Sequence, residues 1–185
     1  MAEEIESADD LYTLDPSEFV TARNALAKQM RKEGRREDAS AVAKLRRPPA
    51  TAWALNITAR EHPDLVVDAL EAGQELRAAT EAAVGGDASG LRSATASERA
   101  AADRLLSAAS AHLGDGREGR ERMSATLRAA AVDEDVADQL RRGVLADDHE
   151  ASGFGFATGF EVGEAPSRPR KAPARTKKKR SEPDE

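Results

Sequence analysis

The stretch from Lys44 to Asn56 constrains the fold most, because it combines two adjacent prolines with the only tryptophan of the chain. Pro48 and Pro49 lack a backbone N–H, and their rings clash with a preceding helical turn, so a helix has to end before them. The fixed φ of proline also suits the first turn of a new helix. The sequence therefore predicts a helix, a corner and a second helix, with Trp53 one turn into the second helix and pointing inward.

Apolar side chains recur at spacings of three and four through most of the chain, and no alternating β-branched run appears. We therefore predict an all-α fold, a bundle of about seven helices. Residues that favour helix ends set most of the expected boundaries, among them Asp15, Gly34, Asp133 and Gly143. The expected helices cover residues 16–33, 36–46, 50–62, 64–84, a segment that begins between 87 and 97 and continues to 113, 117–131 and 133–142.

The two longest periodic segments are joined by a short glycine-containing loop, which predicts an antiparallel helical hairpin. We expect the first three helices to pack around Trp53 and against this hairpin. Gly73 is expected to face alanines of the partner helix, so that the two backbones approach closely. Asn56 lies near the buried face, and we interpret it as a satisfied amide that ties the free carbonyls of the proline corner to its helix.

Charge is distributed unequally along the chain. The net charge is −6. Residues 166–185 carry 8 basic and 3 acidic side chains, a net of +5, whereas residues 1–165 carry 20 basic and 31 acidic ones, a net of −11. The last segment is rich in Pro, Ala, Lys and Arg and cannot bury a core. We expect a disordered acidic arm over 1–10, a helical bundle domain over 11–146, a Gly/Phe segment over 147–163 and a disordered basic tail over 164–185.

Composition also predicts where the protein works. The chain has no cysteine, which fits a reducing compartment and excludes disulfides and thiolate metal sites. The acidic N-terminus does not read as a signal peptide, and no apolar stretch is long enough to span a membrane. We expect a cytoplasmic protein with no membrane contact.

Four stretches carry a resemblance to known proteins. They are Phe19-Val-Thr-Ala-Arg-Asn-Ala-Leu-Ala-Lys, Val42-Ala-Lys-Leu-Arg-Arg-Pro-Pro-Ala-Thr-Ala-Trp-Ala-Leu-Asn, Ala125-Thr-Leu-Arg-Ala-Ala-Ala-Val-Asp, and Arg-Arg-Gly-Val-Leu followed by a Gly-Phe. With them the chain resembles an uncharacterised all-helical family of high-GC bacteria, over roughly Leu11 to Phe160. The most specific part is the Leu-Arg-Arg-Pro-x-x-x-Ala-Trp-x-x-Asn core. The resemblance implies a single helical domain and no activity.

The basic tail is the main indication of function. An extended basic tail neutralises phosphates and releases counterions without reading base sequence. The sequence therefore predicts nonspecific contact with nucleic acid, and the alternative is a solubilising tail or one that folds back onto the acidic body. The candidate contact residues of the tail are Arg168, Arg170, Lys171, Arg175, Lys177, Lys178, Lys179 and Arg180.

A second basic cluster lies between the first helix and the proline corner. If its members share one face, they form a patch of the size of a phosphate group; the alternative is solvated helix ends that complement the helix dipole. A DNA-reading helix-turn-helix is disfavoured, because an Arg-Arg-Pro-Pro joint replaces the short glycine turn. The candidate contact residues here are Lys28, Arg31, Arg35, Arg36 and Arg47, with Lys32, Lys44 and Arg46 beside them.

Phe154, Phe156 and Phe160 make a short apolar segment between glycines. We expect this segment to dock on its own domain or to await a partner groove. The second functional hypothesis follows from it: a protein–protein adaptor that uses the helical hairpin or the Gly/Phe segment and has no role with nucleic acid.

Nothing in the sequence predicts catalysis. No nucleophile elbow, phosphate-binding loop or His-Glu-x-x-His motif is present. The three histidines, His62, His112 and His149, stand apart from one another, without the spacing of metal ligands. We therefore expect no enzyme, no metal and no cofactor.

Overall fold

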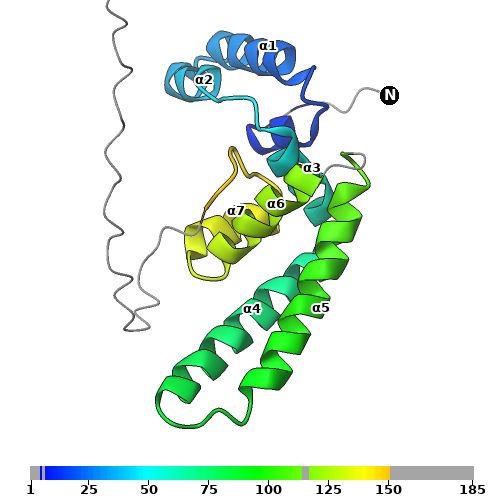
Figure 1. The fold of residues 1–185 in the computed structure, drawn as a ribbon. Coiled ribbons are helices and arrows are strands. Elements are labelled where there is room, and N and C mark those ends of the chain that lie inside the picture. Colours follow the sequence, from blue (N-terminus) through cyan, green and yellow to red (C-terminus); the bar gives the residue numbers. More distant parts are fainter. Residues whose placement is uncertain (1–4, 6, 114–116, 151–185) are drawn as a thin grey trace, which may run out of the picture. The chain divides into compact units, whose positions relative to one another are not determined.

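A computed structural model describes residues 5, 7–113 and 117–150 (Figure 1). All described residues belong to one compact unit. These residues form helices and loops with no strand among them, which confirms the all-α prediction. The elements are a 3₁₀ helix η1 (Asp9–Thr13) and the α-helices α1 (Phe19–Lys32), α2 (Arg36–Ala43), α3 (Ala50–Glu61), α4 (Pro63–Val84), α5 (Leu91–Ser110), α6 (Arg117–Ala130) and α7 (Glu134–Arg142).

Several helix ends lie where local sequence places them. Asp133 caps α7, with its carboxylate accepting hydrogen bonds from the N–H groups of Asp135 and Val136. Gly34 follows α1 in the left-handed region, at φ +84°, and Gly143 follows α7 at φ +65°. At both glycines the next N–H reaches back to a carbonyl of the last helical turn, from Arg35 to Met30 and from Val144 to Gln139. This is the Schellman arrangement, which favours glycine because it lacks a Cβ.

Three helix boundaries differ from the prediction by three residues, and one of them is the end of α5, at Ser110 instead of residue 113. The Asp15 carboxylate accepts hydrogen bonds from the N–H and hydroxyl of Ser17, so it closes a turn of its own and α1 begins only at Phe19. At the other end of this region α2 stops at Ala43. Pro48 keeps only Arg47 out of the α conformation, so it does not by itself end α2 four residues earlier. The last turn closes with the N–H groups of Lys44 and Leu45 donating to the carbonyls of Ala41 and Val42.

The described residues bury two separate apolar cores. The N-terminal core belongs to η1, α1 and α2, and it holds Leu11, Tyr12, Phe19, Leu26, Ala27, Met30, Ala39, Val42 and Val144. The main core belongs to α3–α7 together with Leu145, and most of its buried residues are alanines and leucines. The prediction that the first three helices pack together around Trp53 is therefore wrong. α1 and α2 pack on each other and α1 also packs on η1, whereas α3 packs on η1 and on all four later helices.

Trp53 lies at the edge of the main core, half-buried, and not at its centre. The completely buried positions of α3 are taken by smaller side chains, Ala52, Ala54 and Leu55. The physical reason is crowding: α3 contacts α4, α5, α6, α7 and η1, so there is no room for an indole between them. The ring instead packs edge-on against His112, with the two ring centroids 6.1 Å apart.

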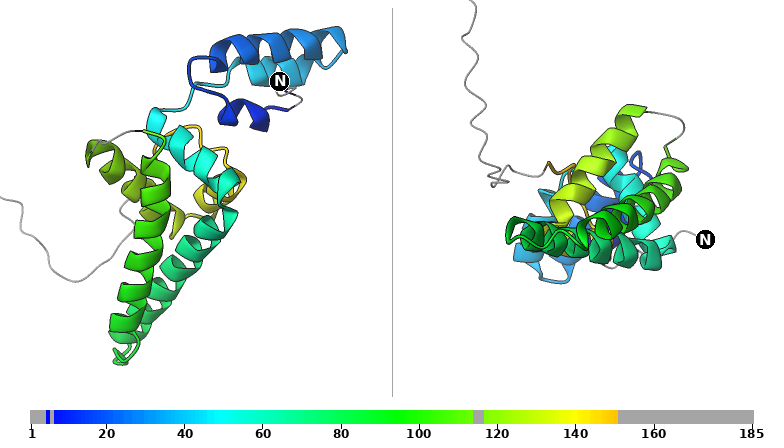
Figure 2. Two further views of the ribbon diagram at one scale, coloured as in Figure 1. Left: turned by 90° about the vertical axis from the view of Figure 1, so that its right-hand side faces the viewer. Right: turned by 60° about the horizontal axis from the view of Figure 1, so that its bottom comes forward.

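α4 and α5 form the predicted antiparallel hairpin, and Figure 2 shows them side by side in both views. The sequence predicts that Gly73 faces alanines of α5, and this prediction is wrong. A Cβ at this position would lie 3.1 Å from the Cβ of Ala131, just after α6. The close approach that glycine permits is therefore between α4 and the corner that joins α6 to α7. Among the described residues no helix is long and apolar enough to cross a membrane.

The described part of the acidic arm is packed, although the sequence predicts disorder over residues 1–10. Ile5 lies against the N-terminal core, and η1 begins at Asp9. The Asp9 carboxylate pairs with Arg142, and its carbonyl accepts a hydrogen bond from Arg60. The arm is held because the adjacent Leu11 is completely buried and has to bring the preceding residues with it.

Candidate interaction surfaces

Charge is divided between the segment of α1 and α2 and the remainder of the chain, and η1, which shares the N-terminal core, adds the carboxylates of Asp9 and Asp10 to the acidic side. The α1–α2 lobe, residues 19–47, holds nine basic and three acidic side chains, a net of +6. Residues 1–18 and 48–165 hold 11 basic and 28 acidic side chains, a net of −17. The sequence identifies both the basic tail and the basic residues of this lobe, and the structure adds that α1 and α2 pack on each other and not on α3.

The helical period gives α1 a basic outer face. At about 100° per residue, Lys28 lies opposite the buried Leu26 and Met30, and Arg31 and Lys32 lie on either side of it. All three cations are exposed. The other side chains on this outer face are uncharged: Thr21, Asn24 and Ala25. The face therefore combines three cations and carries no carboxylate.

The predicted contact residues of the lobe are not all equivalent. Arg35 follows α1 and pairs with Asp38, at 2.9 Å, and with Glu33, at 3.8 Å. In the described part of the chain no carboxylate lies within ion-pair distance of Lys28, Arg31 or Lys32. The same holds for Arg36, Lys44, Arg46 and Arg47, which are also exposed.

The cations lie at two ends of the lobe. One group surrounds the turn between α1 and α2. The other, Lys44 to Arg47, follows α2 at the proline corner. Arg23 fixes this second end, because its Nη1 donates a 2.8 Å hydrogen bond to the carbonyl of Leu45. The face shared by Lys28 and Arg31 is thus a property of α1, whereas Arg47 belongs to the other end of the lobe.

The corner residues have structural roles. Pro48 is buried, and Pro49 precedes the first residue of α3, where its fixed φ of −58° suits a helix start. The indole Nε1 of Trp53 is buried and has no hydrogen-bond partner among the described residues. The indole therefore packs on the main core through its ring carbons, without a hydrogen bond from Nε1.

Asn56 is a satisfied amide, but its partner is not the proline corner. Its side chain is 0% exposed. The Nδ2 group donates to the carbonyl of Leu145 at 2.9 Å, and the N–H of Leu145 donates to Oδ1 at 2.8 Å. The amide thus pairs with both polar groups of one backbone residue. This geometry excludes Asn56 as a reader of base edges.

Residues 143–150, which we call the strap, cross between the two cores. Val144 enters the N-terminal core and its neighbour Leu145 enters the main core. Further along, Asp148 accepts a 2.6 Å hydrogen bond from the hydroxyl of Thr51, and the N–H of His149 donates to the hydroxyl of Thr126 at 3.0 Å. The sequence did not indicate that residues 143–150 form one segment, because the predicted boundary at 146/147 assigned residues 147–150 to the Gly/Phe segment.

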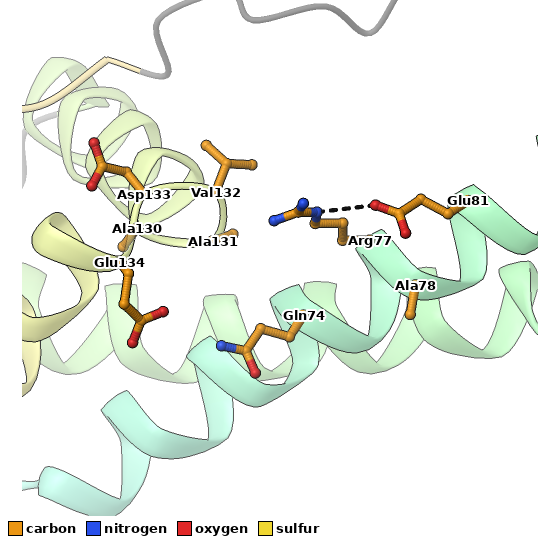
Figure 3. A pocket seen from close by; sticks show the side chains of 9 residues that line it. All are labelled: Gln74, Arg77, Ala78, Glu81, Ala130, Ala131, Val132, Asp133 and Glu134. Carbon is orange, nitrogen blue, oxygen red and sulfur yellow. Dashed lines mark hydrogen bonds and ion pairs between the residues drawn. The ribbon is translucent and has the colours of Figure 1, made fainter.

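A shallow groove lies between α4 and the α6–α7 corner (Figure 3). Its volume is about 330 Å³. The Arg77 guanidinium lies over the groove and pairs with Glu81 at 3.2 Å, as Figure 3 shows. The lining residues are Gln74, Arg77, Ala78, Glu81, Ala130, Ala131, Val132, Asp133 and Glu134. Its one positive group is already neutralised, and the lining offers no nucleophile next to a base.

No group of three or more His, Cys, Asp or Glu side chains suited to a metal ion occurs in the part of the chain that the structure describes. His112 pairs with Glu61, at 3.3 Å between Nε2 and Oε2. Asp148 and His149 are hydrogen-bonded to the helical body through α3 and α6.

Two sets of predicted residues lie outside the described residues. They are the basic residues of the tail, Arg168 to Arg180, and the three phenylalanines at 154, 156 and 160.

No family model, no curated protein and no solved structure matches this chain. The resemblance drawn from the sequence therefore stays a prediction. Two of the stretches that carry it, the Trp-x-x-Asn core and the Arg-Arg-Gly-Val-Leu segment, meet in the structure at the Asn56–Leu145 pair.

Proposed function

We propose that this chain is a cytoplasmic, non-catalytic helical protein that associates with nucleic acid without reading its sequence. The basic tail, residues 166–185, makes one contact and the α1–α2 lobe makes another. The separation of charge carries this proposal: the tail has a net of +5 and the lobe +6, whereas residues 1–18 and 48–165 have a net of −17. A body with that charge repels nucleic acid, so binding has to be concentrated on the two basic segments.

The chemistry of the contact is phosphate neutralisation. Lysine and arginine side chains displace counterions condensed on the nucleic acid, and this release drives binding at low and moderate salt. The outer face of α1 suits this role, since Lys28, Arg31 and Lys32 are exposed and have no carboxylate partner in the described region. Nucleic acid can therefore bind these three side chains without first breaking an ion pair.

A salt titration tests the proposal. Binding of duplex DNA and of RNA is measured by fluorescence anisotropy between about 50 and 200 mM salt, the range over which such contacts lose most of their affinity. Three proteins are compared: the full chain, a chain truncated after Ala165, and a lobe variant with Lys28→Ala, Arg31→Ala and Lys32→Ala. Loss of the tail is expected to reduce the log–log salt slope by roughly 3 to 6, and the lobe variant by up to about 2.7.

The matched control removes the same charge from elsewhere. Arg77→Ala, Arg92→Ala and Arg99→Ala together delete three exposed arginines of the α4–α5 hairpin. This control is expected to bind at least as well as the lobe variant at every salt concentration and to keep the slope of the full chain. Flat, weak binding by all four proteins would refute the proposal.

The α4–α5 hairpin favours a second candidate function, a protein–protein adaptor. At its tip Val84 is 86% exposed, and Val67 is 44% exposed on the same helix α4. The two valines lie 17 residues apart on α4, about 25 Å along its axis, so they do not form one patch, and the candidate contact is the exposed tip at Val84. This function would be favoured if the salt titration fails and Val84→Ser abolishes capture of a defined partner.

A further inference from the structure

The strap is held by two buried side chains that bind its main chain. Asn56 of α3 pairs with both the N–H and the carbonyl of Leu145. Thr126 of α6 does the same for His149: its hydroxyl accepts a 3.0 Å hydrogen bond from the N–H and donates one of 3.3 Å to the carbonyl. Both side chains are completely buried. Two helices thus bind main-chain groups of one segment, and main-chain hydrogen bonds are a common source of affinity in peptide recognition.

Side-chain contacts add selectivity to the main-chain hydrogen bonds. The Leu145 side chain is completely buried in the main core, and the Asp148 carboxylate accepts a 2.6 Å hydrogen bond from the hydroxyl of Thr51. The part of the chain that the structure describes buries four polar side chains: Thr51, Asn56, Thr58 and Thr126. Thr58 bonds a carbonyl of its own helix, and the other three all bond the strap. We call the surface formed by Thr51, Asn56 and Thr126 the cradle. It fits a segment in which a leucine is followed three residues later by an aspartate.

The cradle makes the same contacts with its segment whichever chain supplies it. The segment known to fit is the strap, so the partner whose chemistry matches is a second copy of this chain. When two copies exchange an identical element, each contact that is lost within a chain is regained between chains, which makes exchange a low-cost route to a dimer. The remaining difference in free energy lies in the turn that leads into the strap and in the tethering of the strap to its own body.

Gly143 forms this turn, and the closed turn is crowded. Its φ is +65°, and a Cβ at this position would lie 2.8 Å from the carbonyl oxygen of Asn56. The closed turn therefore accepts glycine and strains any larger residue. Gly143 precedes Leu145, the first strap residue that the cradle clamps, so its backbone can take another direction when the strap binds a second copy. Strain at residue 143 thus favours exchange and leaves the residues of the cradle unchanged.

We propose that the cradle of one copy binds the strap of a second copy, with Leu145 and Asp148 of the exchanged strap taking the places that they hold in the single chain. At low protein concentration the closed chain prevails, because a short tether gives the strap an effective concentration in the millimolar range, on the order of 1 mM. Exchange occurs at high protein concentration or when the closed turn is strained.

A disulfide trap tests the proposal, since the chain has no cysteine of its own. Thr51→Cys is made in one full-length chain and Asp148→Cys in another, each together with Gly143→Ala, and the two proteins are mixed at about 100 µM and oxidised. The mixture is expected to give a covalent dimer that neither protein gives alone. When Gly34→Ala replaces Gly143→Ala, the yield of this dimer is expected to fall at least about fivefold, because Gly34 strains a turn without contacting the cradle.

Two controls accompany the trap. A single chain with both Thr51→Cys and Asp148→Cys is expected to form the disulfide within itself, because the two side chains are in hydrogen-bond contact. Circular dichroism spectra that overlay with that of the full chain establish that each variant is folded.

Three outcomes overturn the proposal. The first is a mixture that gives no more covalent dimer than either protein alone. The second is a yield that is equal with Gly143→Ala and Gly34→Ala, because the closed turn then does not control the strap. The third is a Gly143→Ala chain that stays monomeric by light scattering yet binds a synthetic peptide of residues 143–150, which would make a segment of another protein the occupant. Each result is independent of the binding of nucleic acid.

Discussion

Gly143 is the position where a single methyl group tests the packing of the strap most directly. It lies in the left-handed region at φ +65°, in the Schellman turn that ends α7. A Cβ there would come within 2.8 Å of the carbonyl oxygen of Asn56 and 3.2 Å of the Arg60 side chain. Since the nearest atom is backbone of α3, no side-chain rotation can relieve the contact. We therefore expect Gly143→Ala to move the strap.

The expected cost has two parts. An alanine in the left-handed region costs about 1 to 2 kcal/mol in any setting. Gly34 provides the measure of this part, because it has φ +84° in the same kind of turn and a Cβ there would meet nothing within 4 Å. Overpacking against Asn56 adds about 1 to 3 kcal/mol. We expect Gly34→Ala to destabilise by about 1 to 2 kcal/mol and Gly143→Ala by about 2 to 5 kcal/mol.

Urea unfolding followed by circular dichroism measures both variants on the same chain. The conformational entropy that alanine removes from the unfolded state is common to both substitutions and cancels in the comparison. Gly86→Ala gives a second control, since its φ is +101° and its Cβ would also be free of contacts. If Gly143→Ala lies within about 0.5 kcal/mol of Gly34→Ala, the contact with Asn56 is not tight and the reasoning is wrong.

Two further predictions concern single groups. Asn56→Ala leaves the buried N–H and carbonyl of Leu145 without their Asn56 partners and is expected to lower the free energy of unfolding by about 2 to 5 kcal/mol. The control Asn24→Ala, at an exposed position, is expected to change the free energy of unfolding by less than about 0.5 kcal/mol. Equal effects of the two substitutions would contradict the pairing of Asn56 with Leu145. Burial, and then the negative charge of Asp9, raise the pKa of Tyr12 above its ordinary value of 10.0. Its contribution to stability is therefore complete below pH 10 and is lost as the pH rises further, because the unfolded chain releases the proton first. Tyr12 is the only tyrosine, so a pH titration followed by absorbance near 295 nm reports its ionisation alone. A titration midpoint in the folded protein that is no higher than the midpoint in the urea-unfolded protein would refute the raised pKa.

The sequence predicted those parts of the fold that depend on neighbours along the chain. Asp133, Gly34 and Gly143 mark helix ends through their own hydrogen bonds and backbone conformation, and all three lie where they were expected. Trp53 was placed wrongly, because size alone does not say which face of an alanine-rich helix is enclosed. Gly73 was assigned to the wrong neighbour for a similar reason: small residues mark a close approach but not the partner that approaches.

The candidate surfaces were predictable only in part. The basic residues of the lobe were identified from the sequence, and so was the satisfied amide of Asn56. The partner of Asn56 was not, because Leu145 lies 89 residues away and no local pattern connects the two. The division into two cores was also missed. Apolar periodicity shows which face of each helix is buried, but it does not show which helices share a core.

The two-core arrangement explains how a cationic lobe can act on an acidic protein. The N-terminal core is complete enough to turn the outer face of α1 away from the residues it packs on, so Lys28 faces solvent and not the main core. At physiological ionic strength, charges more than about 8 Å apart are largely screened from one another in solvent. Screening therefore weakens the repulsion that the acidic residues of α3–α7 exert on a phosphate bound at that face, yet these residues still disfavour any orientation that brings nucleic acid onto α3–α7. The strap then has a clear physical role: by placing Val144 in one core and Leu145 in the other, it fixes the lobe to the body and so fixes the one face that nucleic acid can approach.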